Sequence, residues 1–151
     1  MEMNNTEHQL ENTPPQHVLG LEPGSTEADW RRHPNGGGWV YRDAQVAESA
    51  YVGPNAVVYG TAEVCDNAKV LGHAEVYGNA VVYGNAVVSV RAVVCDNARV
   101  LDHAVVYGSA KVFGNAVVSG AAWISGNVEI GGPAEVGGNA WVHGGEWKQK
   151  G

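Results

Sequence analysis

The stretch AEVYGNAVVYGNAVV at residues 74–88 decides the fold, because it repeats an alanine, a valine and a turn pair every six residues. An aliphatic residue, Val or Ile, stands at every sixth position from Val40 to Val142. A second register, four residues after the first, runs from Ala44 to Ala140 and is alanine at every step except Val128. Two such registers, kept without an insertion over two thirds of the chain, predict a solenoid.

The spacing within each unit indicates how its side chains point. The alanine and the valine are two residues apart on an extended segment, so both face inward, and β-branched valine suits a pleated strand. The next two positions form a turn, commonly Gly-Asn or Asp-Asn, and Pro54-Asn55 fills the same positions. Proline followed by asparagine is typical of a type II turn with a positive φ at the asparagine. Three such turns close a triangular coil, so eighteen units predict about six coils.

The repeat also sets the domain boundaries. Residues 37–144 are predicted to form the β-helix, residues 1–36 an N-terminal arm, and residues 145–151 a C-terminal tail. Met1 to Gln16 is polar and is expected to be disordered. Because a solenoid needs its ends covered, Leu19, Leu21 or Trp30 is expected to cap the first coil, and Trp147 the last.

Composition excludes several classes of partner. The formal net charge is −7, and no basic stripe is present, which argues against duplex nucleic acid and anionic membranes. The chain lacks an apolar run that could span a bilayer and lacks a signal-peptide pattern, so a cytoplasmic location is expected. Cys65 and Cys95 do not make a disulfide framework, and no cofactor is indicated.

With three units per coil, residues eighteen apart stack and divide the outward side chains among three faces. The first face presents aromatic side chains, the third a band of Val and Trp, and the second is the most charged. Large exposed apolar patches usually mark interfaces, so the first and third faces are predicted to join subunits of a homo-oligomer. Two alternatives are that these side chains only satisfy cross-strand pairing on a regular sheet, or that the N-terminal arm buries them. The expected interface residues are Tyr41, Tyr59, Tyr77 and Phe113 on the first face and Val87, Val105 and Trp123 on the third.

The V-x-G-N-A-x pattern resembles the hexapeptide-repeat, left-handed β-helix superfamily, and its style is closest to uncharacterised hexapeptide proteins of bacteria and phages. The resemblance implies an all-β, left-handed parallel β-helix that assembles as a homotrimer. It also implies two chemistries known in the superfamily, namely acyl transfer with a histidine base and carbonic anhydrase activity at a zinc ion.

His73 and His103 are the candidates for a catalytic base in an acyltransferase that uses an acyl-CoA donor. Both stand where other units carry asparagine, so a structural role in a positive-φ turn is the competing interpretation. They are five units apart and lie on different corners, so they cannot share a metal ion, and no metal site is predicted. The repeat also lacks the loop insertions that build acyl-donor sites in the superfamily, which argues against catalysis.

Val90-Arg91 is the irregular turn pair, because neither residue is suited to a turn. It lies on the corner between the third and first faces, where His73 is its neighbour one coil away. An arginine beside a histidine can hold a phosphate or carboxylate, although a tolerated turn variant is the alternative. The sequence therefore predicts a non-enzymatic scaffold or binding protein that holds a small, nucleotide-like anion at subunit junctions. The resemblance adds phage origin as an alternative.

Overall fold

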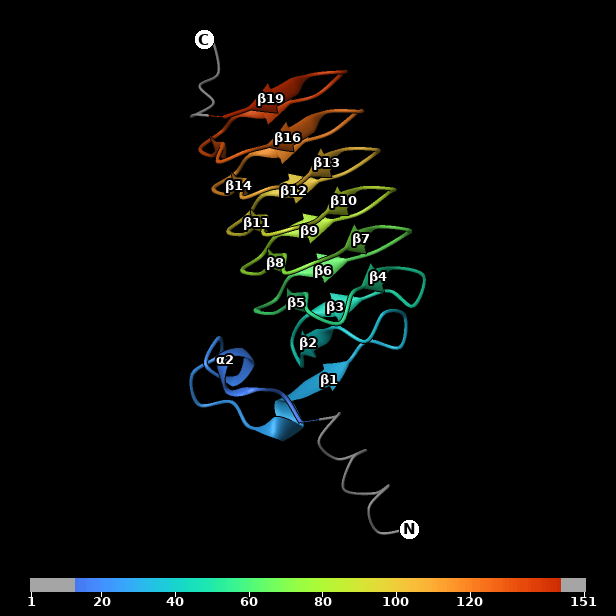
Figure 1. Ribbon diagram of the computed structural model, residues 1–151, viewed down its shortest axis with the longest axis vertical. Coiled ribbons are helices and arrows are strands. Elements are labelled where there is room, and N and C mark those ends of the chain that lie inside the picture. Colours follow the sequence, from blue (N-terminus) through green and yellow to red (C-terminus); the bar gives the residue numbers. More distant parts are fainter. Residues whose placement is uncertain (1–12, 145–151) are drawn as a thin grey trace.

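The alanine–valine repeat folds into eighteen short strands, β2 to β19, in the computed structural model, which describes residues 13–144 (Figure 1). Three strands and three corners make one coil, and the coils stack along one axis. The strands of the solenoid are β2 (Trp39–Tyr41), β3 (Gln45–Val46), β4 (Tyr51–Val52), β5 (Val57–Val58), β6 (Glu63–Val64), β7 (Lys69–Val70), β8 (Glu75–Val76), β9 (Val81–Val82), β10 (Val87–Val88), β11 (Val93–Val94), β12 (Arg99–Val100), β13 (Val105–Val106), β14 (Lys111–Val112), β15 (Val117–Val118), β16 (Trp123–Ser125), β17 (Glu129–Ile130), β18 (Glu135–Val136) and β19 (Trp141–His143).

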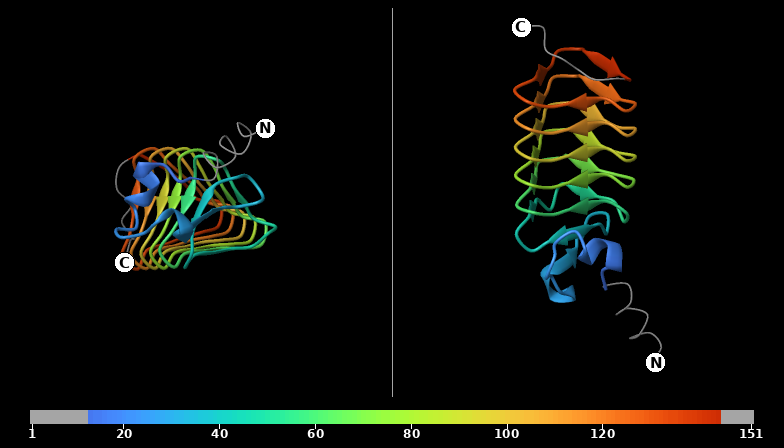
Figure 2. Two further views of the ribbon diagram at one scale, coloured as in Figure 1. Left: turned by 90° about the horizontal axis from the view of Figure 1, so that it is seen from below. Right: turned by 90° about the vertical axis from the view of Figure 1, so that its left-hand side faces the viewer.

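The strands assemble into three parallel sheets that correspond to the three predicted faces. The first face has the strand order β2-β5-β8-β11-β14-β17, to which β1 (Trp30–Arg32) adds an antiparallel edge strand beside β2. The second face has the order β18-β15-β12-β9-β6-β3, and the third β19-β16-β13-β10-β7-β4. Within the solenoid, paired residues are eighteen apart, as in Val87 opposite Val105. Both views of Figure 2 show the coils stacked in register. The prediction of an all-β solenoid with about six coils is confirmed.

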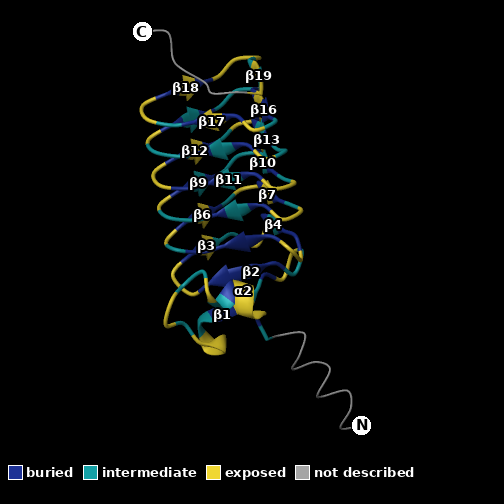
Figure 3. Cartoon of the chain, turned by 60° about the vertical axis from the view of Figure 1, so that its left-hand side comes forward, coloured by how far each residue is buried: buried dark blue, intermediate teal, exposed yellow. Residues whose placement is uncertain are grey.

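The core consists of the two inward registers. The alanines and valines from Ala50 to Ile130 that face the axis are essentially inaccessible, and Val128 fills the one non-alanine position at 0% exposure. Figure 3 shows buried strand positions alternating with exposed corners. Each buried valine contributes about 1.5–3 kcal/mol through the apolar surface removed from water, so the repeat itself supplies the driving force for folding.

The corners differ from the prediction in which residue takes the positive φ. From Gly60 to Gly144 the first member of each turn pair has the left-handed backbone, for example Gly78 with φ 66° and Asp66 with φ 58°. Asn55, His73 and His103 do not have a positive φ, so that interpretation of the second position was wrong. The first position also lies directly against the next coil, because a Cβ at Gly78 would come 2.8 Å from the backbone nitrogen of Asp96.

Aspartate at the first turn position compensates for this crowding with a hydrogen bond. The carboxylates of Asp66, Asp96 and Asp102 each accept from the backbone N–H of the glycine eighteen residues later, at 3.0 Å in every case. Glycine avoids the steric cost, and aspartate offsets it by giving the next coil a hydrogen-bond acceptor. These two solutions explain why most units have either glycine or aspartate at the first turn position.

Val90 satisfies neither requirement. Its φ is 65°, a conformation that strongly disfavours β-branched residues, and its side chain is 50% exposed. A valine has no oxygen to offer the N–H of Gly108, the equivalent glycine one coil on. Val90 and the Arg91 that follows it form the irregular turn pair found in the sequence, and the structure shows that this turn is strained.

The arm covers the N-terminal end of the solenoid. It contains α2 (Gln16–Leu19), a 3₁₀ turn η1 (Glu27–Asp29) and the strand β1 (Trp30–Arg32). β1 pairs antiparallel with β2. In the connection between these two strands, the Gly38 N–H donates to Val52 O at 2.9 Å. The buried His33 ring bonds Ala50 O at 2.8 Å. Backbone and polar donors of the arm thus satisfy the open edges of the first coil, as an end cap must.

The apolar residues expected to cap the first coil, Leu19, Leu21 and Trp30, pack against the side of the solenoid. Trp30 lies on the first face in edge contact with Tyr41, with ring centroids 5.2 Å apart, and Leu19 and Leu21 pack against the same aromatic cluster. Tyr41 and Tyr59 are each only 8% exposed. The arm, not a second subunit, covers these two predicted interface residues. The prediction of disorder for residues 1–12 and the cap prediction for Trp147 lie outside the described residues, whereas Gln16, also expected to be disordered, begins α2.

We expect Val90→Asp and Val90→Gly to raise the melting temperature. Glycine removes the strain of the positive φ, and aspartate adds an acceptor for Gly108 N–H, so each should stabilise the protein by about 1–2 kcal/mol. Val90→Ile is the matched control, because it stays β-branched and should not gain stability. Thermal unfolding curves compare the three, and two unchanged or lowered melting temperatures for the Asp and Gly variants would rule out strain at Val90.

Candidate functional site

A groove lies on the corner between the third and first faces, beside the arm. The cavity at the C-terminal end of this groove has a volume of about 330 Å³ and is lined by His73, Glu75 and Arg91. His73 is in the turn between β7 and β8, Glu75 begins β8, and Arg91 is in the turn between β10 and β11. The structure therefore places on one cavity the two residues, His73 and Arg91, that the sequence predicts as an anion site.

The backbone ladder holds these residues in place. His73 N–H donates to Val90 O at 2.7 Å, and Arg91 N–H donates to Gly108 O at 2.8 Å. The two positions are one coil apart, which corresponds to about 4.8 Å along the axis. Both side chains are exposed, so the guanidinium and the imidazole can meet a ligand together without first leaving a buried partner.

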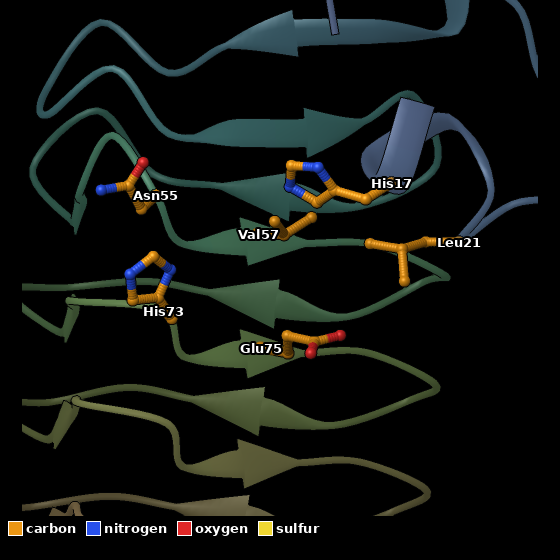
Figure 4. Close-up of a pocket in the computed structure, with 6 residues that line it drawn as sticks. All are labelled: His17, Leu21, Asn55, Val57, His73 and Glu75. Carbon is orange, nitrogen blue, oxygen red and sulfur yellow. The ribbon is translucent and has the colours of Figure 1, made fainter. Parts of the chain in front are cut away.

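The arm supplies the opposite wall. A second cavity of about 300 Å³ shares His73 and Glu75 with the first and is also lined by His17, Leu21, Asn55 and Val57. Figure 4 shows Asn55 above His73 on the corner, with Val57 and Glu75 on successive strands beneath α2. His17 comes from α2 itself. The wall is thus intrachain, where the sequence predicted a junction between subunits.

A third cavity of about 210 Å³ continues the groove toward the N-terminal end, where Arg32 and Trp39 line it. The Arg32 guanidinium lies 4.3 Å from the centre of the Trp39 ring and donates to Gly37 O at 2.8 Å. These contacts hold a second positive charge at the far end of the groove. The groove therefore has an arginine at each end and one carboxylate, Glu75, between them.

Tyr59 fixes the position of Glu75. The Tyr59 hydroxyl donates to Glu75 Oε1 at 2.9 Å. Burial, together with the hydrogen bond and the charge of Glu75, raises the pKa of Tyr59 well above its usual range. The phenol therefore stays protonated and remains a donor. Because it binds only Oε1, the second carboxylate oxygen of Glu75 is available to accept a hydrogen bond from a ligand.

The rest of the first face supports this arrangement. Tyr77 stacks on Tyr59 with ring centroids 4.7 Å apart. Burial, followed by a hydrogen bond with Cys95, raises the pKa of Tyr77 to about 12. Burial also raises the pKa of the Cys95 thiol, which is 3% exposed, and both Cys95 and Cys65 are free. These features indicate a packed support for Glu75 and not a nucleophilic site, because a reactive cysteine needs a lowered pKa.

The other predicted residues lie apart from the groove. His103 is exposed on the corner between the second and third faces. Phe113 lies farther along the first face, where Lys111 Nζ is 5.4 Å from its ring centre. Val87, Val105 and Trp123 lie on the third face. Within residues 13–144, no three His, Cys, Asp or Glu side chains gather as a metal site would require, and no helix is long and apolar enough to cross a membrane.

Sequence reasoning missed Glu75, His17 and Arg32. Glu75 is in the outward position directly before a core valine, and the eighteen-residue stacking could have placed it beside the His73 corner. His17 and Arg32 are outside the repeat, so no periodicity reports where they lie. Their positions depend on how the arm docks.

Glu22 anchors the arm through the same interaction that the turn aspartates use. Its Oε1 accepts from Gly60 N–H at 2.8 Å. Gly60 holds the first turn position, but Arg42, and not an aspartate, stands one coil before it. The arm carboxylate therefore occupies the place of the missing aspartate. A salt bridge of 3.0 Å from Arg42 to Asp29 adds a second link between arm and coil.

Comparison with known proteins supports the structural class. The family model described as YdcK Beta solenoid repeat matches residues 74–89 and 110–126, which contain β8 to β10 and β14 to β16. The matched segments make up less than half of the chain, and they support a β-solenoid repeat. No curated protein and no solved structure matches the chain. The finer resemblance to hexapeptide acyltransferase-type proteins stays a prediction.

We expect Glu22→Ala to loosen the arm at Gly60. Without the carboxylate, the Gly60 amide loses a charge-assisted hydrogen bond, so its hydrogen-exchange rate measured by NMR should rise by about tenfold. Glu27→Ala is the control, because Glu27 is an exposed carboxylate on the same arm. Equal exchange rates at Gly60 in the Glu22 variant and the wild type would contradict the anchoring role.

Proposed function

We propose that the protein is a β-solenoid binding protein that holds a small, nucleotide-like anion in the groove between the arm and the corner of the third and first faces. The observation that carries the proposal is the shared cavity of His73, Glu75 and Arg91. Its volume and that of the adjoining cavity under α2 both lie at the lower end of the range for small-molecule sites.

The anionic group of the ligand binds at Arg91 and His73. A planar guanidinium can donate two parallel hydrogen bonds to a phosphate or carboxylate, and the imidazole one coil away adds a third donor. Val90 keeps Arg91 next to a strained turn, and strained backbone conformations cluster at binding sites.

The remaining part of the ligand extends toward the arm. Glu75 accepts a hydrogen bond from a hydroxyl, such as that of a ribose, because Tyr59 occupies only one of its oxygens. The apolar side chains of Val57 and Leu21 then face the most apolar portion of the ligand. Carboxylate, cation and apolar wall together favour a nucleoside monophosphate over a bare inorganic anion.

Acyl transfer is the second candidate, since His73 opens onto the same groove and could act as a base. The unbroken repeat provides no loop that would enclose an acyl-CoA. Binding without turnover therefore has the stronger support.

We expect adenosine monophosphate to bind the wild-type protein and Arg91→Gln to weaken binding by at least about tenfold, as measured by isothermal titration calorimetry. Glu75→Gln should weaken adenosine monophosphate relative to inorganic phosphate, because only the ribose hydroxyl uses the Glu75 acceptor, whereas loss of the carboxylate removes a repulsion from both anions. Arg99→Gln is the matched control, since Arg99 is an exposed arginine on the second face.

Two results would overturn this proposal. Equal affinity of the Arg91 and Arg99 variants would show that the groove does not select the anion. Release of free thiol from acetyl-CoA by the wild type, but not by His73→Ala, would assign acyl transfer to the groove.

A further inference from the structure

The third face presents a largely apolar surface, interrupted by Lys69, in the part of the chain that the structure describes. Its strands are in register, so that the residues before each core aliphatic form one column along the solenoid. Trp123 is 50% exposed and Trp141 is 73% exposed. From the N-terminal to the C-terminal end, the column reads Tyr51, Lys69, Val87, Val105, Trp123 and Trp141.

The other two faces are not equivalent to it. The arm covers the first face around Tyr41 and Tyr59. The corresponding column of the second face carries Glu63, Arg99 and Glu135, all exposed. A ring of three subunits needs two different complementary surfaces on each subunit, whereas a two-fold dimer needs one self-complementary surface. With one apolar face, the dimer is the simpler closed assembly.

We propose that a second copy of this chain packs on the third face, with the two solenoids antiparallel about a two-fold axis that crosses the column between Val87 and Val105. This proposal does not depend on the proposed ligand.

The column is self-complementary in that antiparallel arrangement. Val87 of one copy meets Val105 of the other at the centre, where apolar contact is densest. On either side, the only charged residue of the column, Lys69, meets Trp123, and a lysine over an indole is a favourable cation–π pair. At the ends Tyr51 meets Trp141, which forms an aromatic pair. The edge contact of Tyr107 with Trp123, at 5.9 Å between ring centroids, already holds this indole in position.

A parallel arrangement would not be complementary. It would bring Lys69 against Lys69 across the interface, and like charges directly opposite one another are destabilising. The position of the single lysine therefore favours the antiparallel arrangement.

Sedimentation equilibrium of the full chain tests the assembly. The wild type should sediment at twice the chain mass of 15.9 kDa at micromolar concentration. Val87→Glu should sediment as a monomer, because it places two carboxylates at the centre of the interface. Val117→Glu is the matched control and should remain dimeric, since Val117 is a half-buried valine at the same strand position on the second face.

Lys69→Gln tests the orientation with a surface change that leaves the core intact. In the antiparallel dimer it removes two cation–π pairs and should weaken dimerisation by about fivefold or more. In a parallel dimer it would remove a repulsion and strengthen dimerisation. A wild-type monomer or trimer, dissociation by Val117→Glu as readily as by Val87→Glu, or a tighter Lys69→Gln dimer would each overturn the proposal.

Discussion

Each coil is joined to the next by backbone hydrogen bonds between residues about eighteen apart, and the corners are where this ladder is hardest to maintain. The first turn position must take a positive φ while its Cβ would press on the next coil. Glycine removes the clash, and aspartate offsets it by accepting the N–H of the next coil. The arm uses the same chemistry when Glu22 accepts from Gly60. The same turn chemistry therefore contributes both to the stacking of the coils and to the docking of the arm.

Regular stacking fixes where every outward side chain lies, so functional features must arise as departures from the repeat. The strained Val90 turn, the non-repeating arm and the two exposed tryptophans are such departures. The first two meet at one corner and form the groove. The tryptophans lie toward the C-terminal end of the third face, so the proposed ligand site and the proposed dimer contact centre on different residues.

The sequence predicts the features that follow from the period of six. The six-residue repeat predicts the core registers. The eighteen residues of each coil predict the three faces and the corner that His73 and Arg91 share. The residue with positive φ was assigned wrongly at the corners because glycine, asparagine and aspartate all tolerate this conformation, and composition alone does not rank them. The roles of His17 and Glu75, and the burial of Tyr59, could not be predicted because they depend on tertiary contacts of the arm.

Hydrogen–deuterium exchange with and without adenosine monophosphate tests the groove most directly, since it reports on the arm and the corner in one experiment. If the ligand bridges them, exchange should slow in peptides that cover α2 and in those that cover residues 72–91, with no change in β16 and β19 on the third face. Unchanged exchange in both α2 and residues 72–91, or protection confined to the third face, would contradict a binding site between the arm and the solenoid.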